Sequence, residues 1–174
     1  MLLMCATSSA QMKWNQSYQT YINQYKDLAI EQMLRYRIPA SITLAQGLFE
    51  SRAGQSDLVR QGNNHFGIKC HNWTGPTQYH DDDARGECFR VYQDAKESYE
   101  DHSRFLAKQP RYSRLFSLNT TDYKGWAHGL KSCGYATNPQ YANKLIQIIE
   151  LYRLQDYDKA KSYDRFMATH SGTD

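Results

Sequence analysis

The chain has 174 residues and a mass of 20.3 kDa, with 40% hydrophobic and 22% charged residues, so its length fits one domain with a sizeable core. The net charge of +3 is too small to favour a nucleic-acid-binding protein. The 13% of aromatic residues disfavour a disordered chain, and no apolar run is long enough for a transmembrane helix.

Residues 1–10 resemble a signal peptide remnant. An uncharged apolar run is followed by small residues, and Ser8-x-Ala10 offers a cleavage site before Gln11. We therefore expect an exported protein, periplasmic or extracellular, although the usual basic start of a signal peptide is missing. Lipid attachment at Cys5 is a weaker alternative because Met4 is bulky where a small residue is usual, and an ordinary chain terminus is another.

The helical periodicity of apolar residues predicts that most of the remaining chain forms helices. Pro39 and Pro110 separate helices, Asp94 and Glu97 form a capping-box-like start, and Asn138-Pro139 is expected to cap the last helix. The expected helices cover 18–37, 39 to 52–54, 94 to about 110, a segment around 123–130, and a last one that buries Tyr141, Leu145, Ile148, Ile149 and Tyr152.

The middle of the chain has a different character. The segments 66–70, 77–80 and 88–92 are short, β-branched or aromatic, and separated by turn-forming residues, which predicts a small β-hairpin or meander. The expected fold class is α+β, mainly α, with one domain over 11–156 and a polar tail over 157–174.

Three cysteines lie after the expected signal segment 1–10. Cys70 and Cys88 bracket the β segment, and a disulfide between them would close a loop of about 18 residues and contribute up to ~3 kcal/mol. A zinc site from these two cysteines with His71 and His80 is the alternative, but the ligands lack the paired spacing of zinc motifs. Cys133 is then expected to be a buried free thiol.

The acidic residues suggest a reaction class. Motifs for phosphate-binding loops, serine hydrolases and HExxH metalloproteases are absent from the sequence. Glu50 lies near the end of an apolar helix, whereas Asp81, Asp82 and Asp83 form a polar turn. Glycoside hydrolases use one protonated and one ionised carboxyl in such contrasting settings. The structural alternatives are a solvated Glu50 and a turn that is solvated or contacts calcium.

Four blocks in order carry a family resemblance: LAQGLFESRAGQS (44–56), GNNHFGIK (62–69), FRVY (89–92) and YATNPQYANKL (135–145). Together they resemble glucosaminidase domains of glycoside hydrolase family 73, over about residues 19–152. The resemblance implies a lysozyme-like helical domain with a small β lobe that hydrolyses peptidoglycan glycan strands after N-acetylglucosamine. It also implies that no metal or cofactor takes part; a monomer is expected.

The resemblance also implies roles for two residues. The first block aligns Glu50 with the general acid, and a carboxyl at the inner end of a buried helix that faces a cleft should have a raised pKa. Tyr135 falls where similar enzymes place a tyrosine beside the catalytic glutamate. Its hydroxyl is expected to orient a sugar N-acetyl group or the attacking water.

Five further residues are candidates for substrate binding, each with a structural alternative. The second block turns the chain into the β lobe, which gives its asparagine an architectural role as the alternative. Aromatic residues on a small β lobe stack on sugars or form a core of their own. The candidates are Asn64, Phe66, Trp73, Tyr79 and Tyr141.

The sequence departs from the family at the second acid. Members often carry Thr-Glu-Tyr in the β lobe, whereas this chain has Thr77-Gln78-Tyr79. Asp82 is the nominated base or charge stabiliser, and assistance by the substrate's own acetamido group is the alternative. A muramidase, a lytic transglycosylase and a non-catalytic glycan-binding module remain rival functions.

Overall fold

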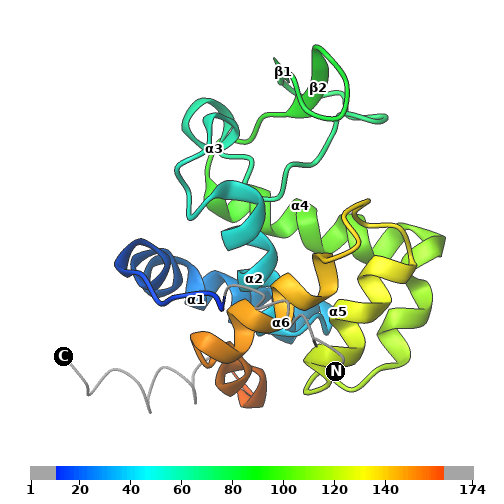
Figure 1. Ribbon diagram of the computed structural model, residues 1–174. Coiled ribbons are helices and arrows are strands. Elements are labelled where there is room, and N and C mark those ends of the chain that lie inside the picture. Colours follow the sequence, from blue (N-terminus) through cyan, green and yellow to red (C-terminus); the bar gives the residue numbers. More distant parts are fainter. Residues whose placement is uncertain (1–10, 163–174) are drawn as a thin grey trace, which may run out of the picture.

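A computed structural model describes residues 11–162 and has the expected mainly helical α+β fold (Figure 1). The proposed signal segment 1–10 and the end of the polar tail lie outside the described residues. In chain order the elements are α1 (Gln16–Tyr36), α2 (Ala40–Ser51), α3 (Asp57–Gly62), β1 (Thr77–His80), β2 (Glu87–Arg90), α4 (Ala95–Lys108), the 3-10 helix η1 (Pro110–Ser117), α5 (Tyr123–Ser132), α6 (Tyr141–Leu151) and the 3-10 helix η2 (Leu154–Lys159).

Helix α2 is the centre of the core. Every residue over 40–48 is buried, because α1, α5, α6 and η2 all pack against this helix. A helix that is covered on all sides needs small or apolar residues all round, which α2 provides except at Gln46, whose amide is hydrogen-bonded. It ends at Ser51 and is followed by Arg52, which has a left-handed φ of 49°. Glu50 therefore lies in its last turn, where the helix leaves the core.

The β lobe is an antiparallel hairpin at one end of the molecule (Figure 1). Thr77 on β1 pairs with Arg90 on β2, and His80 pairs with Glu87. The predicted third strand over 66–70 is wrong, since Lys69 forms only an isolated bridge with Phe89. The side chain of Asn64 bonds both the N–H and the C=O of Ile68, so residues 64–68 form a turn held by a side chain.

The disulfide between Cys70 and Cys88 is confirmed, with their Cα atoms 5.4 Å apart. Both sulfurs are therefore used, which excludes the alternative zinc site. The third cysteine differs from expectation: Cys133 is free but only half-buried, and its sulfur accepts a hydrogen bond from Arg114 Nε at 3.1 Å.

Two details near the C-terminus also differ from expectation. Asn138 does not cap α6; its side chain and carbonyl bond the N–H groups of Gln140 and Tyr141, which form a turn before the helix. Packing continues beyond residue 156, because the Asp158 carboxylate is buried in η2 and accepts hydrogen bonds from the N–H and hydroxyl of Ser41. Within residues 11–162, no helix has both the length and the apolar character needed to span a bilayer.

Candidate active site

A groove of about 410 Å³ lies where the helical part meets the β lobe. Its walls come from the end of α2, the turn after α3, the loop between β1 and β2, the α4–η1 region and the segment before α6. The lining residues are Phe49, Glu50, Phe66, Gly67, Ile68, Lys69, His71, Asp82, Asp83, Phe105, Arg111, Tyr112, Gly134, Tyr135, Ala136, Thr137, Asn138 and Tyr141.

Glu50 faces this groove from the last turn of α2. Burial, and secondarily the negative charge of Asp82, raise the pKa of the Glu50 carboxyl to about 7. The turn at Gly67 passes close by, since a Cβ built on Gly67 would lie 3.7 Å from Glu50 Oε2. Gly67 has a φ of +62°, a conformation that glycine adopts without a steric penalty. A carboxyl in this setting can hold a proton near neutral pH.

Among the three acids of the turn 81–83, Asp82 is the one whose carboxylate has no hydrogen-bond or ion-pair partner within residues 11–162. Asp81 Oδ1 accepts from the N–H of Gly86, and the Asp83 carboxylate pairs with Lys69. The Asp82 carboxylate is exposed, lines the groove, and forms no hydrogen bond or ion pair with residues 11–162. The three acids of the turn therefore have different environments, and one of them is available to a substrate or water.

Tyr135 and Tyr141 line the groove as a stacked pair, with ring centroids 5.7 Å apart. Burial, followed by neighbouring negative groups that include Glu50, raises the pKa of both hydroxyls. Both side chains are therefore neutral at pH 7, so each hydroxyl can donate a hydrogen bond.

A buried network of hydrogen-bonded side chains contacts Tyr141. Gln46 Nε2 donates to the Tyr141 hydroxyl at 2.9 Å, and Gln46 Oε1 lies 2.9 Å from His102 Nε2. Burial lowers the pKa of His102 to about 3, so the imidazole is neutral, and Phe66 stacks on it at 3.9 Å. Gln46 thus satisfies the Tyr141 oxygen, and Tyr141 is fully buried, which is the core position that its place at the start of α6 allows.

The structure brings together only part of the predicted site. Asn64 is buried and serves the backbone of Ile68 and Arg90, which is the architectural alternative. Trp73 and Tyr79 do not line the groove, and Tyr79 is 68% exposed. Phe66 contributes to the wall but is largely covered by Tyr99 and His102. The predicted residues that meet in the groove are Glu50, Asp82, Tyr135, Tyr141 and Phe66.

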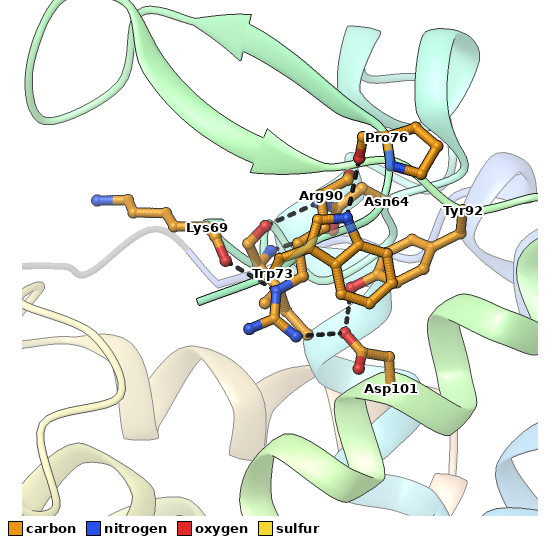
Figure 2. A network of polar contacts seen from close by, with 8 residues as sticks. Asn64, Lys69, Trp73, Pro76, Arg90, Tyr92 and Asp101 are labelled. Atoms are coloured by element: carbon orange, nitrogen blue, oxygen red, sulfur yellow. Dashed lines mark hydrogen bonds and ion pairs between the residues drawn. The ribbon is translucent and has the colours of Figure 1, made fainter. Parts of the chain in front are cut away.

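Trp73 belongs instead to a polar network that joins the β lobe to α4 (Figure 2). Arg90 donates to the carbonyl of Lys69 at 3.0 Å and to the Asp101 carboxylate at 2.9 Å. The indole of Trp73 lies over the Arg90 guanidinium at 5.1 Å, and its N–H bonds the carbonyl of Pro76. This packing explains why the tryptophan is unavailable to a sugar in the groove.

Several groove residues carried no signal in the sequence. Arg111 follows a helix-ending proline outside every motif block, and His71 suggested only a metal ligand. The Asp82, Asp83 and Glu87 carboxylates cluster near the groove, but the Lys69 ammonium already bonds two of them. Lys69 therefore supplies positive charge to Asp83 and Glu87, whereas Asp82 stays unpaired.

Comparisons with known proteins identify the family. The sequence profile of Glucosaminidase, described as mannosyl-glycoprotein endo-beta-N-acetylglucosaminidase, matches residues 26–154. The chain is 35% identical to exo-glucosaminidase LytG of Bacillus subtilis over 72% of its own length, and 32% identical to peptidoglycan hydrolase FlgJ of Salmonella typhimurium over 72%. It spans only 48% and 43% of the lengths of these two relatives.

The fold agrees with solved structures. The catalytic domain of the autolysin Auto from Listeria monocytogenes superimposes with a TM-score of 0.69 at 30% identity, covering 85% of this chain and 91% of that domain. The chain therefore shares its overall fold with this domain.

Proposed function

The chain belongs to the glucosaminidase family, glycoside hydrolase family 73, and on this basis we propose that it hydrolyses the glycan strands of bacterial peptidoglycan after N-acetylglucosamine, with Glu50 as the general acid. The observation that carries the proposal is a carboxyl at the end of a buried helix, with a pKa of about 7, in a groove large enough for sugars. Family membership supports the substrate class, and the geometry supports the role of the residue.

The proposed reaction uses the contrast between the two acids. Protonated Glu50 donates its hydrogen to the glycosidic oxygen while the bond from that oxygen to the anomeric carbon breaks. Asp82, from the loop between β1 and β2, accepts a proton from the water that attacks the anomeric carbon. Tyr135 orients the acetamido group through its hydroxyl, and the fully buried Tyr141 supports the ring of Tyr135 by stacking on it. If the acetamido oxygen attacks first, Asp82 stabilises the positive charge that develops on it.

Export is part of the proposal. Peptidoglycan lies outside the cytoplasmic membrane, and the signal-like segment 1–10 and the Cys70–Cys88 disulfide are both compatible with an oxidising compartment. We propose that the chain acts in the periplasm or outside the cell.

The test is Glu50→Gln, which keeps the shape of the side chain and removes the transferable proton. Solubilisation of purified cell walls should fall by about 10²–10⁴-fold, the usual contribution of a general acid. Glu31→Gln on α1, away from the groove, is the matched control and should retain wild-type activity. A folded Glu50→Gln protein with near wild-type activity would contradict the assignment.

Fragment analysis tests the cleaved bond. Mass spectrometry of the released sugars should find N-acetylglucosamine at the reducing ends. Muramic acid at those ends would indicate a muramidase, and anhydro-muramyl ends would indicate a lytic transglycosylase. Binding to walls without any release of sugar would indicate a glycan-binding module.

A further inference from the structure

The groove contains one positive charge that the protein does not neutralise. Of its two basic side chains, Lys69 is held by Asp83 at 3.4 Å and Glu87 at 3.0 Å. The guanidinium of Arg111 forms no ion pair or hydrogen bond with any residue that the structure describes. An arginine stays charged at every physiological pH, so this charge is permanent.

The Arg111 side chain is nevertheless held in a defined place. Its guanidinium carbon lies 4.7 Å from the centroid of the Tyr112 ring, and a Cβ built on Gly134 would be 3.9 Å from its Nη1. The face of an aromatic ring attracts the guanidinium, whose N–H groups remain free to donate. Gly134 keeps the adjacent wall open. A planar group with free donors suits a two-pronged carboxylate contact.

His71 lies near this arginine on another element of the groove. It follows the disulfide-bonded Cys70, has a left-handed φ of 46°, and its ring is 5.9 Å from that of Phe105. Burial and the positive charges of Arg90, Arg111 and Lys69 lower the pKa of His71, so the imidazole is a neutral hydrogen-bonding group at pH 7. The charge of Arg111 thus lowers the pKa of His71. The pKa of Glu50, by contrast, is raised by burial and by the charge of Asp82.

The proposed substrate has a matching group. The sugar rings of peptidoglycan are neutral, but the lactyl arm of N-acetylmuramic acid carries a peptide with free carboxylates. Chitin consists of neutral N-acetylglucosamine alone and has no such group. We propose that Arg111, with His71 as a neutral hydrogen-bond partner, binds a carboxylate of the peptide-bearing lactyl arm and so selects peptidoglycan over neutral glycans. This inference rests on the proposed function and adds a recognition subsite to it.

The experiment compares two substrates that differ only in charge. Walls freed of teichoic acid are used as they are, or after their carboxylates have been converted to amides. Wild type should have a kcat/KM about fivefold higher on the charged walls, as expected for a partly exposed ion pair of about 1 kcal/mol. Arg111→Gln should process both substrates equally, and Arg111→Lys should retain part of the preference because it keeps the charge without the planar fork.

Arg114→Gln is the matched control, since it makes the same charge change on the same 3-10 helix outside the groove. It should keep the full preference for charged walls. Sedimentation of the Glu50→Gln protein with both kinds of wall measures binding without turnover. The Arg111→Gln substitution in that background should reduce binding only to the charged walls.

The outcomes separate the two proposals. If wild type releases no sugar from either substrate, the proposed function fails, and the sedimentation experiment still tests the subsite. If Arg111→Gln lowers activity and binding equally on both substrates, or if wild type does not distinguish them, the carboxylate subsite is refuted while the hydrolase assignment stands.

Discussion

At the scale of single residues, Glu50 links function to stability. The folded protein holds the proton of Glu50 up to about pH 7, whereas a glutamate in an unfolded chain releases it near its ordinary pKa of about 4.3. The folded state therefore binds more protons than the unfolded state between these values. By linkage, the contribution of Glu50 to stability is fully present below about pH 4 and is lost as pH rises to about 7.

Glu50→Gln should consequently stabilise the protein in a pH-dependent way. Its free energy of unfolding should match that of wild type near pH 4 and exceed it by about 1–3 kcal/mol at pH 8, because glutamine cannot ionise. Denaturant titrations of both proteins at several pH values measure the difference. Asp158, whose pKa burial also raises to about 7, is present in both proteins and cancels. A difference that does not change between pH 4 and pH 8 would contradict the raised pKa.

The sequence predicts some site residues better than others, for physical reasons. Glu50 and Tyr135 lie in ordered motif blocks and line the groove. Tyr79 could not be placed, because only the hairpin register decides which face a strand residue takes, and here Gln78 is buried while Tyr79 is exposed. Arg111 reaches the groove through the turn between α4 and η1, a tertiary arrangement that local periodicity does not encode.

At the scale of elements, the turn over 64–68 is held by one side chain. Asn64 Nδ2 donates to the carbonyls of Ile68 and Arg90, and its Oδ1 accepts from the N–H of Ile68 at 3.1 Å. This turn carries Phe66 and Gly67 to the groove. The asparagine that sequence analysis offered as a substrate ligand thus has a backbone-capping role that shapes the site.

Asn64→Ala should therefore lower the free energy of unfolding by about 2 kcal/mol, since the buried N–H of Ile68 loses its acceptor. Asn63→Gly is the matched control. Asn63 has a φ of +53° and its side chain makes one hydrogen bond, to the carbonyl of Tyr92, so glycine there should cost less than about 1 kcal/mol. Thermal or urea unfolding measures both. Equal losses for the two variants would argue against the special role of Asn64.

The boundaries of helices and strands are predicted well where local sequence sets them and poorly where long-range contacts do. The first two helices were predicted closely, because the Ile38-Pro39 pair separates them and their apolar faces are long. The prediction of a strand over 66–70 is wrong because apolar residues in a short buried turn have the same composition as a strand. The deciding bonds come from Asn64, and composition alone does not reveal them.

At the scale of the whole molecule, a small polar interface connects the β lobe to the helical part. The Arg90 guanidinium, with 9% of its side chain exposed, pairs with Asp101 on α4, and the hydroxyl of Tyr92 donates to the same carboxylate (Figure 2). The groove has residues of both parts on its walls, so this interface helps to set the distance between Asp82 and Glu50. Asp101 is thus expected to affect both stability and activity although it does not line the groove.

The last prediction concerns Asp101→Asn, which leaves the largely buried Arg90 guanidinium without its counter-charge. Breaking a buried ion pair on one side typically costs 3–5 kcal/mol, and we expect about 3 kcal/mol because 18% of the Asp101 side chain is exposed. Arg35→Gln is the control: it removes a pair whose arginine side chain is 50% exposed and should cost less than about 1 kcal/mol.

Hydrogen exchange locates the effect of Asp101→Asn. Amide protons of β1 and β2 should exchange faster than in wild type, whereas those of α2 and α6 should keep their relative protection, because the lost contact joins only the β lobe to α4. Cell-wall hydrolysis should fall as well, since a loosened lobe no longer holds Asp82 in a fixed position relative to Glu50. If the exchange rates rise uniformly over the whole chain, the β lobe and the helical part unfold as one unit, and Asp101 contributes to global stability alone.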